Sequence, residues 1–413
     1  MRLIRGKAKR VRAEPGPILI LCRRIQKRGL KYVITLHYSA FDFPCSPSFY
    51  GTRSMKHFFY TGIAALALAS TAVSAAKADD ASKRFSGEIA FELQDDWNYK
   101  SDDRGNLNNQ LTPTIEPSAT LQLAPGWSIS GVAVMEAIGD PKKFENRVFE
   151  DIGLYVEELF AEYSGDRLGG KAGKLNPGFG VAWDMAPGLY GTDLAEDYET
   201  SERIGFVGSW VVGAGRFGTH TVSASTFFAD TSILSESALR GRGDTRKRDG
   251  GVSNTESFES FLVALNGEDL PLPGKPGYHL SFMKQEAGQG DTADENSFAA
   301  GIFASFDLGN ALSFDPLVEI VQQTNQGGVS GQDRFYLTAG GQLSWSGWNV
   351  AASVTERYTD NVSATNNTDT HFQVSAGYSF DFGLSIDIGW KVSEDAGTET
   401  RTLGALAAYT LEF

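Results

Sequence analysis

The amino-acid sequence predicts an all-β fold: a transmembrane, antiparallel, up-and-down β-barrel of about 16 strands. Three observations lead to this prediction. Apolar and polar residues alternate with a period of two from Arg84 onward, short and long connections alternate along the chain, and the last strand is apolar on one face up to its final residue. No apolar run reaches the ~18 residues that suggest a spanning helix. A barrel needs no such run, because every second residue of its strands faces a polar interior.

The composition narrows the classes of protein. The chain has 413 residues, a formal net charge of -14 at pH 7 and 46 glycines. This acidity argues against nucleic acid as a partner. The two cysteines, Cys22 and Cys45, both precede the segment described next. We therefore expect a mature protein without disulfides or a thiolate metal site, and no cofactor.

The region around Met55 resembles a secretory signal peptide. Met55 opens a short basic stretch, residues 58–71 form an apolar core, and small residues at 73–78 supply cleavage sites. Because such signals begin a chain, we expect residues 55–78 to be the signal peptide, residues 79–413 the barrel, and residues 1–54 a disordered upstream extension. The alternative is a functional basic arm or organelle-targeting segment, since residues 1–54 hold 12 Lys or Arg against two acids.

The strands are predicted from alternation. The first strand places five residues on its apolar face, opposite Ser, Glu, Ala and Gln: Phe85, Gly87, Ile89, Phe91 and Leu93. The same pattern returns in segments 115–123, 372–380 and 384–392. A helix would scatter these apolar residues around its axis, so the pattern indicates strands. The register is ambiguous at 156–163 and 258–265, where we consider β-bulges.

The connections sort by length. Seven short turns, rich in Gly, Pro, Asn or Asp, are predicted at 124–126, 165–166, 214–216, 269–276, 309–310, 346–347 and 382–383. Eight longer polar links lie between them, at 98–111, 140–151, 176–202, 230–254, 288–293, 324–331, 359–369 and 394–400. Seven and eight connections join 16 strands and put both termini on the side of the short turns. A soluble all-β protein would alternate too, but it would not sort its loops by length.

The last strand, residues 401–413, also favours a membrane barrel. Its apolar face runs through Tyr409 and Leu411 to the terminal Phe413. With these features the chain from about Arg84 to Phe413 resembles sixteen-stranded bacterial outer-membrane porins. The resemblance implies that Tyr409, Leu411 and Phe413 act as the assembly signal read by the barrel-assembly machinery. It also implies a homotrimer in contact with outer-membrane lipid and lipopolysaccharide, with a third external loop folded into the barrel.

The third long link, residues 176–202, has the composition of a loop packed against a wall. It combines apolar anchors such as Phe179 and Tyr198 with several glycines and two prolines. In the porin arrangement its carboxylates would line the narrowest point of the pore. The candidate constriction residues are Asp184, Asp193, Glu196, Asp197, Glu199 and Glu202.

The candidate lumen bases are spread along the chain, unlike the dense arginine cluster opposite the loop in familiar porins. They are Lys171, Arg203, Arg334, Arg357 and Lys391. Because the chain is acidic and the first strands also place glutamates on their polar face, we expect mild cation selectivity. An ordered surface loop whose acids only keep it soluble is the alternative.

The predicted function is a water-filled outer-membrane channel for passive diffusion of ions and small hydrophilic solutes. We expect no catalytic residues and no metal site: His220, His279 and His371 lie on separate strands, and no nucleophile motif is present. The alternatives are a substrate-specific channel for sugars or anions, a barrel enzyme and an adhesin.

Overall fold

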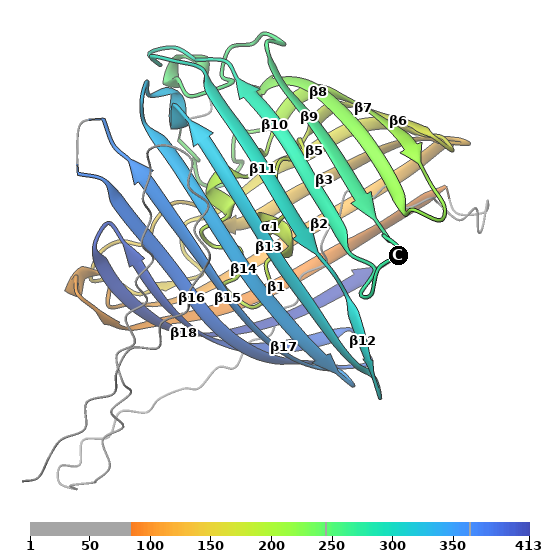
Figure 1. Ribbon diagram of the computed structural model, residues 1–413. Coiled ribbons are helices and arrows are strands. Elements are labelled where there is room, and N and C mark those ends of the chain that lie inside the picture. Colours follow the sequence, from red (N-terminus) through yellow and green to blue (C-terminus); the bar gives the residue numbers. More distant parts are fainter. Residues whose placement is uncertain (1–83, 244–245, 363–364) are drawn as a thin grey trace, which may run out of the picture. The chain divides into compact units, whose positions relative to one another are not determined.

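The chain closes into a β-barrel, which Figure 1 shows from the side in a computed structural model. The structure describes residues 84–243, 246–362 and 365–413. The predicted extension 1–54 and the predicted signal peptide 55–78 lie outside these ranges.

The sheet holds 18 strand segments that form 16 barrel strands. β11 and β12 are two parts of one strand, since both pair with β13, and β4 is a two-residue segment that pairs in parallel with β2. Their bounds are β1 Phe85–Ser101, β2 Asn109–Ala124, β3 Trp127–Ala137, β4 Arg147–Val148, β5 Ile152–Ser164, β6 Leu168–Leu175, β7 Arg203–Gly213, β8 Thr219–Ala229, β9 Ser260–Glu268, β10 Gly277–Gln285, β11 Glu295–Phe303, β12 Phe306–Gly309, β13 Leu312–Thr324, β14 Asp333–Trp345, β15 Trp348–Asp360, β16 Asn367–Ser379, β17 Leu384–Asp395 and β18 Thr398–Glu412. The predicted strand number and antiparallel order are confirmed.

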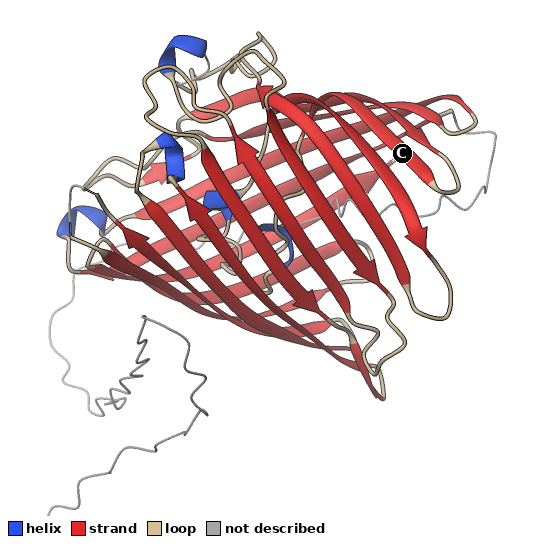
Figure 2. Cartoon of the chain, turned by 45° about the horizontal axis from the view of Figure 1, so that its top comes forward, coloured by secondary structure: helices blue, strands red, loops and turns tan. Residues whose placement is uncertain are grey.

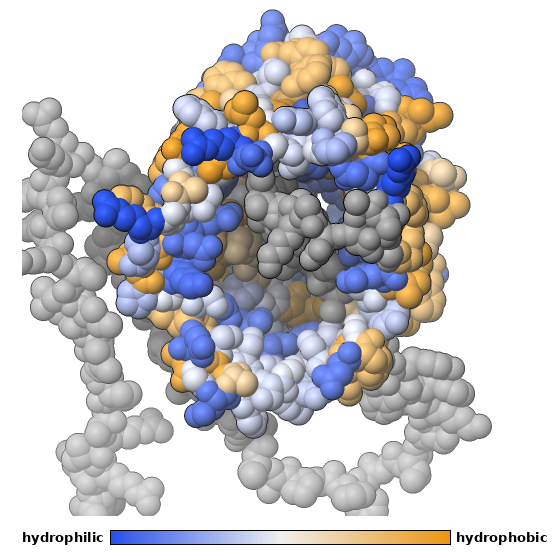
Figure 3. Space-filling view, turned by 90° about the vertical axis from the view of Figure 1, so that its right-hand side faces the viewer, coloured by the Kyte–Doolittle hydropathy of each residue, from blue (hydrophilic) through white to orange (hydrophobic). Residues whose placement is uncertain are grey.

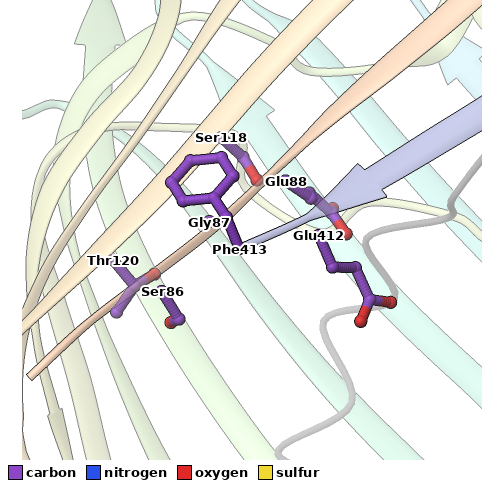
Figure 4. A pocket seen from close by; sticks show the side chains of 7 residues that line it. All are labelled: Ser86, Gly87, Glu88, Ser118, Thr120, Glu412 and Phe413. Atoms are coloured by element: carbon purple, nitrogen blue, oxygen red, sulfur yellow. The ribbon is translucent and has the colours of Figure 1, made fainter. Parts of the chain in front are cut away.

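The barrel closes where the last strand meets the first. β18 pairs antiparallel with β1, with Ile89 opposite Leu411. The pairing extends to the terminal residue, because the Phe413 N–H donates to the Gly87 carbonyl at 3.0 Å and the Gly87 N–H donates back at 3.2 Å. Figure 4 shows the Phe413 ring beside Gly87. Closure leaves no strand edge unpaired here, which a sheet in lipid requires.

The apolar face of the strands points outward. Successive strands each leave large apolar side chains between about two-fifths and three-fifths exposed, and many of the residues between them are buried. Examples of the outward set are Phe282 42%, Phe298 45%, Val350 51%, Ile388 62% and Leu403 40%. In Figure 3 apolar residues gather along the outer flanks, and hydrophilic residues surround the hollow. This is the surface that contact with acyl chains demands.

Aromatic residues mark the end of the barrel that carries the short turns. The ring centroids of Trp127 and Tyr163 lie 5.0 Å apart, and those of Trp348 and Tyr378 lie 4.9 Å apart. All four are outward and lie beside a tight turn. Amphipathic rings at this level are typical of a membrane interface.

The connections agree with the predicted turns at 269–276 and 346–347, and with the long link at 176–202. One prediction is wrong. The expected long loop at 394–400 is a two-residue turn, Ala396–Gly397, because β17 and β18 pair up to Asp395 and Thr398. Both turn residues have positive φ, 48° and 77°, as hairpin turns of this length require.

The ambiguous register in β5 has a structural cause. Between the pairs Val132–Glu158 and Ala133–Val156 the register shifts by one residue, so Glu157 is the extra residue of a bulge. A bulge lets two consecutive side chains lie on the same side of a sheet. It therefore brings Glu157 and Glu158 to the lumen, where both contact Asn176.

The helical segments are short. They are α1 Ala182–Met185 and the 3-10 turns η1 Arg104–Asn106, η2 Glu196–Tyr198, η3 Lys247–Asp249 and η4 Gln326–Gly328. Across the residues that the structure describes, no helix is long and apolar enough to cross a membrane. Figure 2 shows helical segments within the ring of strands as well as at one end of it.

Gly87 is predicted to be intolerant of a side chain. A Cβ there would lie 2.6 Å from the Phe413 ring and 2.6 Å from the Ser118 carbonyl oxygen, so Gly87→Val should destabilise the barrel by roughly 1–3 kcal/mol. Urea unfolding of the refolded protein in detergent micelles measures this. Gly208→Ala is the control, because a Cβ at Gly208 meets nothing within 4 Å. Equal stability of the two variants would contradict the prediction.

Candidate functional site: the lumen and the loop that crosses it

Residues 176–202, between β6 and β7, run along the inner wall of the barrel. We call this segment the lumen loop. Its contacts reach side chains on β1, β5, β10, β13, β16 and β17, and its Tyr190 hydroxyl lies against Gly404 of β18. Inward orientation follows from the strands themselves: Glu319, which contacts the loop, lies between Val318 and Ile320, and both of these are exposed on the outer face.

The lumen loop rests on an apolar seat. Phe179, Ala182, Ala195 and Tyr198 are at most 2% exposed. They pack against inward residues of β8 to β14, namely Phe227, Leu262, Ala264, Met283, Ala299, Leu317, Val321 and Tyr336. Burial of these apolar side chains stabilises the position of the loop against the wall. The apolar anchors predicted from the sequence include Phe179 and Tyr198, and the seat shows what they contact.

Glu319 is the polar centre of the seat. Its carboxylate accepts hydrogen bonds from the Val181 N–H at 2.6 Å, the Ala182 N–H at 2.9 Å and the Tyr198 hydroxyl at 2.7 Å. Val181 is the N-cap residue of α1, so the carboxylate satisfies amide groups that a helix start leaves free. One residue therefore joins both helical segments of the loop to β13. The side chain is only 1% exposed, so water cannot replace these bonds.

Two predicted constriction acids lie in ion pairs with predicted lumen bases. Asp193 pairs with Lys391, whose amine also lies 4.4 Å from the Tyr190 ring centroid. Asp197 pairs with Arg357 and, at 3.4 Å, with Arg334. The structure thus brings acids and bases together, so that each neutralises the other.

The third paired acid, Glu202, lies where the loop rejoins the barrel wall. It contacts the Lys174 amine at 2.9 Å and the Arg242 guanidinium at 2.5 Å. Although burial opposes it, the hydrogen bonds from Arg242 and Lys174 lower the pKa of Glu202. Its backbone N–H donates to the Asn176 side chain at 2.8 Å, which ties the end of the lumen loop to its start.

The other three loop acids make no ion pair within the described ranges. Asp184, Glu196 and Glu199 belong to this group, and Glu196 is among the loop's exposed residues. Burial raises the pKa of Asp184 to about 6. Burial, followed by repulsion from Glu157 and Glu196, raises the pKa of Glu199 to about 8. Asp184 is therefore mostly ionised at pH 7, whereas Glu199 is mostly protonated at that pH and is fully charged only above about pH 8.

Further carboxylates project from the lumen face of the first strands. Glu136 accepts from the Tyr155 hydroxyl at 2.7 Å, and Glu157 accepts from Asn176 at 2.8 Å. Glu92 and Glu116 lie on the same face of β1 and β2, in the phase opposite Phe91 and Ile115. Glu199 is near enough to both Glu136 and Glu157 to be repelled by them. Acids of the loop and acids of this wall therefore face one region of the lumen.

The remaining two predicted bases differ from the other three. The Lys171 amine lies 4.5 Å from the Phe160 ring centroid, on β6 beside Glu162 of β5. Arg203 lies in the first position of β7, and Glu202 and Glu295 are among its charged neighbours. Neither forms an ion pair within 4 Å among the residues that the structure describes. The five bases do not form one cluster, in agreement with their spread along the sequence.

Sequence reasoning missed Glu319, Lys174, Asp230 and Arg242. Glu319 had a usable signal, because it is a lone acid in the alternating segment Leu317–Val321 and must face the lumen there. Lys174 and Asp230 had no usable signal in the sequence. By alternation both belong to the outward-facing side of their strands, and the loop that covers them comes from another part of the chain. In the described ranges, no group of three or more His, Cys, Asp or Glu is arranged to hold a metal ion.

The fold is that of bacterial outer-membrane porins and channels. The chain is similar in structure to OprB of Pseudomonas putida, with a TM-score of 0.56 and 8% identity over 79% of this chain and 94% of that chain. It is similar also to the outer-membrane channel DcaP of Acinetobacter baumannii, with a TM-score of 0.52 and 9% identity over 79% and 96%. At these identities the likeness concerns the fold. No family model and no curated protein matches the sequence.

Glu319→Gln should loosen the lumen loop. A glutamine offers one acceptor oxygen where three donors converge, and its NH₂ group would oppose at least one of them, at a cost of about 1–3 kcal/mol. We expect faster amide hydrogen exchange at Val181 and Ala182, measured by mass spectrometry in micelles. Glu356→Gln, an exposed acid of β15, is the control. Unchanged exchange in Glu319→Gln would show that the apolar seat alone fixes the loop.

Proposed function

We propose that this protein is an outer-membrane channel through which ions and small hydrophilic solutes diffuse passively, with a preference for cations. The observation that carries the proposal is the division of the lumen carboxylates into two sets. Asp193, Asp197 and Glu202 hold the lumen loop against basic residues. Asp184, Glu196 and Glu199 are left to act on a permeating ion.

The lumen loop divides the barrel unequally. Apart from Asn176 at its start, which contacts Glu157 and Glu158 of β5, the loop has most of its contacts with β8 to β18 and β1. We therefore place the passage between the loop and the wall of β2, β3 and β5. Glu116, Glu136 and Glu157 line that wall, and the unpaired loop acids face them. A low-dielectric wall focuses the field of such charges on the ion in the passage. This arrangement has carboxylates on both sides of the path, rather than acids opposite arginines.

The setting of the channel follows from the same surfaces. The outward apolar band would be in contact with lipid, and the exposed bases Arg246 and Lys247 at the loop end would lie at the level of lipopolysaccharide phosphates. Tyr409 and Leu411 of β18 and the following Phe413 point outward, where the assembly machinery would read them. We propose a homotrimer on the grounds of the porin resemblance.

Reversal potentials in planar bilayers test the proposal. A gradient of KCl across a membrane with the purified protein should give a potential of the sign that K⁺ permeation produces. Liposome swelling with sugars of graded size should show a cut-off. A protein that inserts and conducts nothing would contradict the channel, and a clear chloride preference would contradict the charge assignment.

Removing unpaired loop acids should weaken cation preference. A unit charge about 6 Å from an ion in water contributes roughly 0.7 kcal/mol, which is about threefold in the permeability ratio. At about pH 9, where both carboxyls are ionised, Asp184→Asn and Glu199→Gln should each lower the K⁺ to Cl⁻ ratio by about this factor. Asp269→Asn, in the short turn before β10, is the matched control and should leave the ratio unchanged. If all variants had the same K⁺ to Cl⁻ ratio as the wild type, Asp184 and Glu199 would not determine the selectivity, and the prediction would be wrong.

Cation preference should also depend on pH in an unusual range. A raised pKa means that the negative charge is complete only above that pKa and is lost as the pH falls through it. With values of about 8 for Glu199 and about 6 for Asp184, selectivity should decline between pH 9 and pH 5. Ordinary carboxylates, with pKa near 4, would not titrate there. The double variant Asp184→Asn, Glu199→Gln should show a flatter profile in the same bilayer measurement, and a flat wild-type profile would refute the assignment.

A further inference from the structure

The barrel wall has a gap where the lumen loop leaves it. β6 ends at Leu175, and its last pairs with β5 are at Leu159, so the upper part of β5 has no β6 residue beside it. The fourth long connection, which follows β8, fills this place. The Val156 N–H donates to the Leu234 carbonyl at 3.1 Å, and the Ala238 N–H donates to the Leu154 carbonyl at 2.8 Å. Residues 234–238 thus satisfy a strand edge that would otherwise be open.

The same connection covers a buried ionic cluster at the two ends of the lumen loop. The Lys174 side chain is 1% exposed, and its amine lies 2.9 Å from Glu202 and 2.9 Å from Asp230. The Ser235 hydroxyl accepts from this amine at 2.6 Å. Lys174 lies two residues before the loop, Glu202 ends it, and Asp230 begins the fourth connection. The cluster therefore joins three segments that are distant in sequence.

Arg242 completes the cluster from the fourth connection. Its guanidinium lies 2.5 Å from the Glu202 carboxylate and 3.4 Å from the Tyr155 ring centroid. Since one oxygen of Glu202 contacts Lys174 and the other contacts Arg242, the carboxylate is held from two sides. Glu202 needs this support, because its φ of 55° lies in the left-handed region that a glutamate seldom adopts.

We propose that residues 230–242, the latch, hold the lumen loop in its seat, and that Arg242 is a positioning residue for the passage. This rests on the proposed channel function. Arg242 acts through Glu202: it neutralises the carboxylate at the point where the loop rejoins β7. Without Arg242, only Lys174 compensates the charge of Glu202, whose backbone is strained. The lumen loop then leaves its seat more often, and the width of the passage fluctuates.

The test compares Arg242→Gln with Arg248→Gln in planar bilayers. Arg248 is in the same connection, its side chain is 71% exposed, and its nearest acid is the adjacent Asp249 at 3.8 Å. We expect Arg242→Gln to raise the fraction of time in abnormal conductance levels about tenfold, as a minor state of a few tenths of a per cent becomes one of several per cent. Arg242→Lys, which retains the charge, should recover part of the wild-type behaviour, whereas Arg248→Gln should match the wild type.

A double-mutant cycle separates positioning from general damage. Because both groups act through one contact, Arg242→Gln and Glu202→Gln together should disturb the current no more than the worse single variant. Hydrogen exchange of the amides at 180–186 gives a readout that needs no conduction, and it should quicken in Arg242→Gln while the urea midpoint of the barrel stays constant. A wild type that does not conduct would refute the channel. A conducting wild type with Arg242→Gln indistinguishable from Arg248→Gln, in current and exchange, would refute the latch.

Discussion

The constraint on which this structure depends is that backbone amides in lipid have no water to bond to. A sheet in lipid satisfies this constraint only when it closes into a barrel. Here β18 closes the barrel by pairing with β1 as far as Phe413. Closure then fixes the chemistry of both faces. With a period of two, the outward residues must be apolar and the inward residues are free to be polar, so the lumen acquires its charges as a consequence of the strand geometry.

The lumen loop resolves a conflict that closure creates. A barrel of 16 strands is too wide to discriminate among small solutes, and a polar loop would have no reason to remain inside it. The loop therefore carries its own apolar surface to β8–β14 and its own acceptors and acids to the bases of β14, β15 and β17. The carboxylates that form ion pairs with the wall are neutralised by their basic partners and have little effect on an ion in the passage. In the proposed channel, the residual field would come from the acids without bases, and these acids would set the sign of the selectivity.

Much of the fold could be predicted from the sequence because alternation and turn chemistry are local. Phe85 to Leu93 and the turn at 346–347 carry their own signals, and the structure agrees with both. The site could be predicted only in part. Composition alone identified the acids of residues 176–202, but it could not tell Asp193 from Glu199. That difference depends on whether Lys391 happens to stand opposite on a strand almost two hundred residues later.

The latch shows why the missed residues were beyond sequence reasoning. Lys174 lies in the outward phase of β6, and an outward lysine in a barrel would be read as an interfacial residue. It is buried because the wall is incomplete there, and the wall is incomplete because β6 ends early to release the lumen loop. The fourth connection must then supply both the missing hydrogen bonds to β5 and the counter-charges to Lys174. Folding a loop into the lumen thus requires a second loop to repair the wall, and the two are coupled through Glu202 by the geometry of that repair.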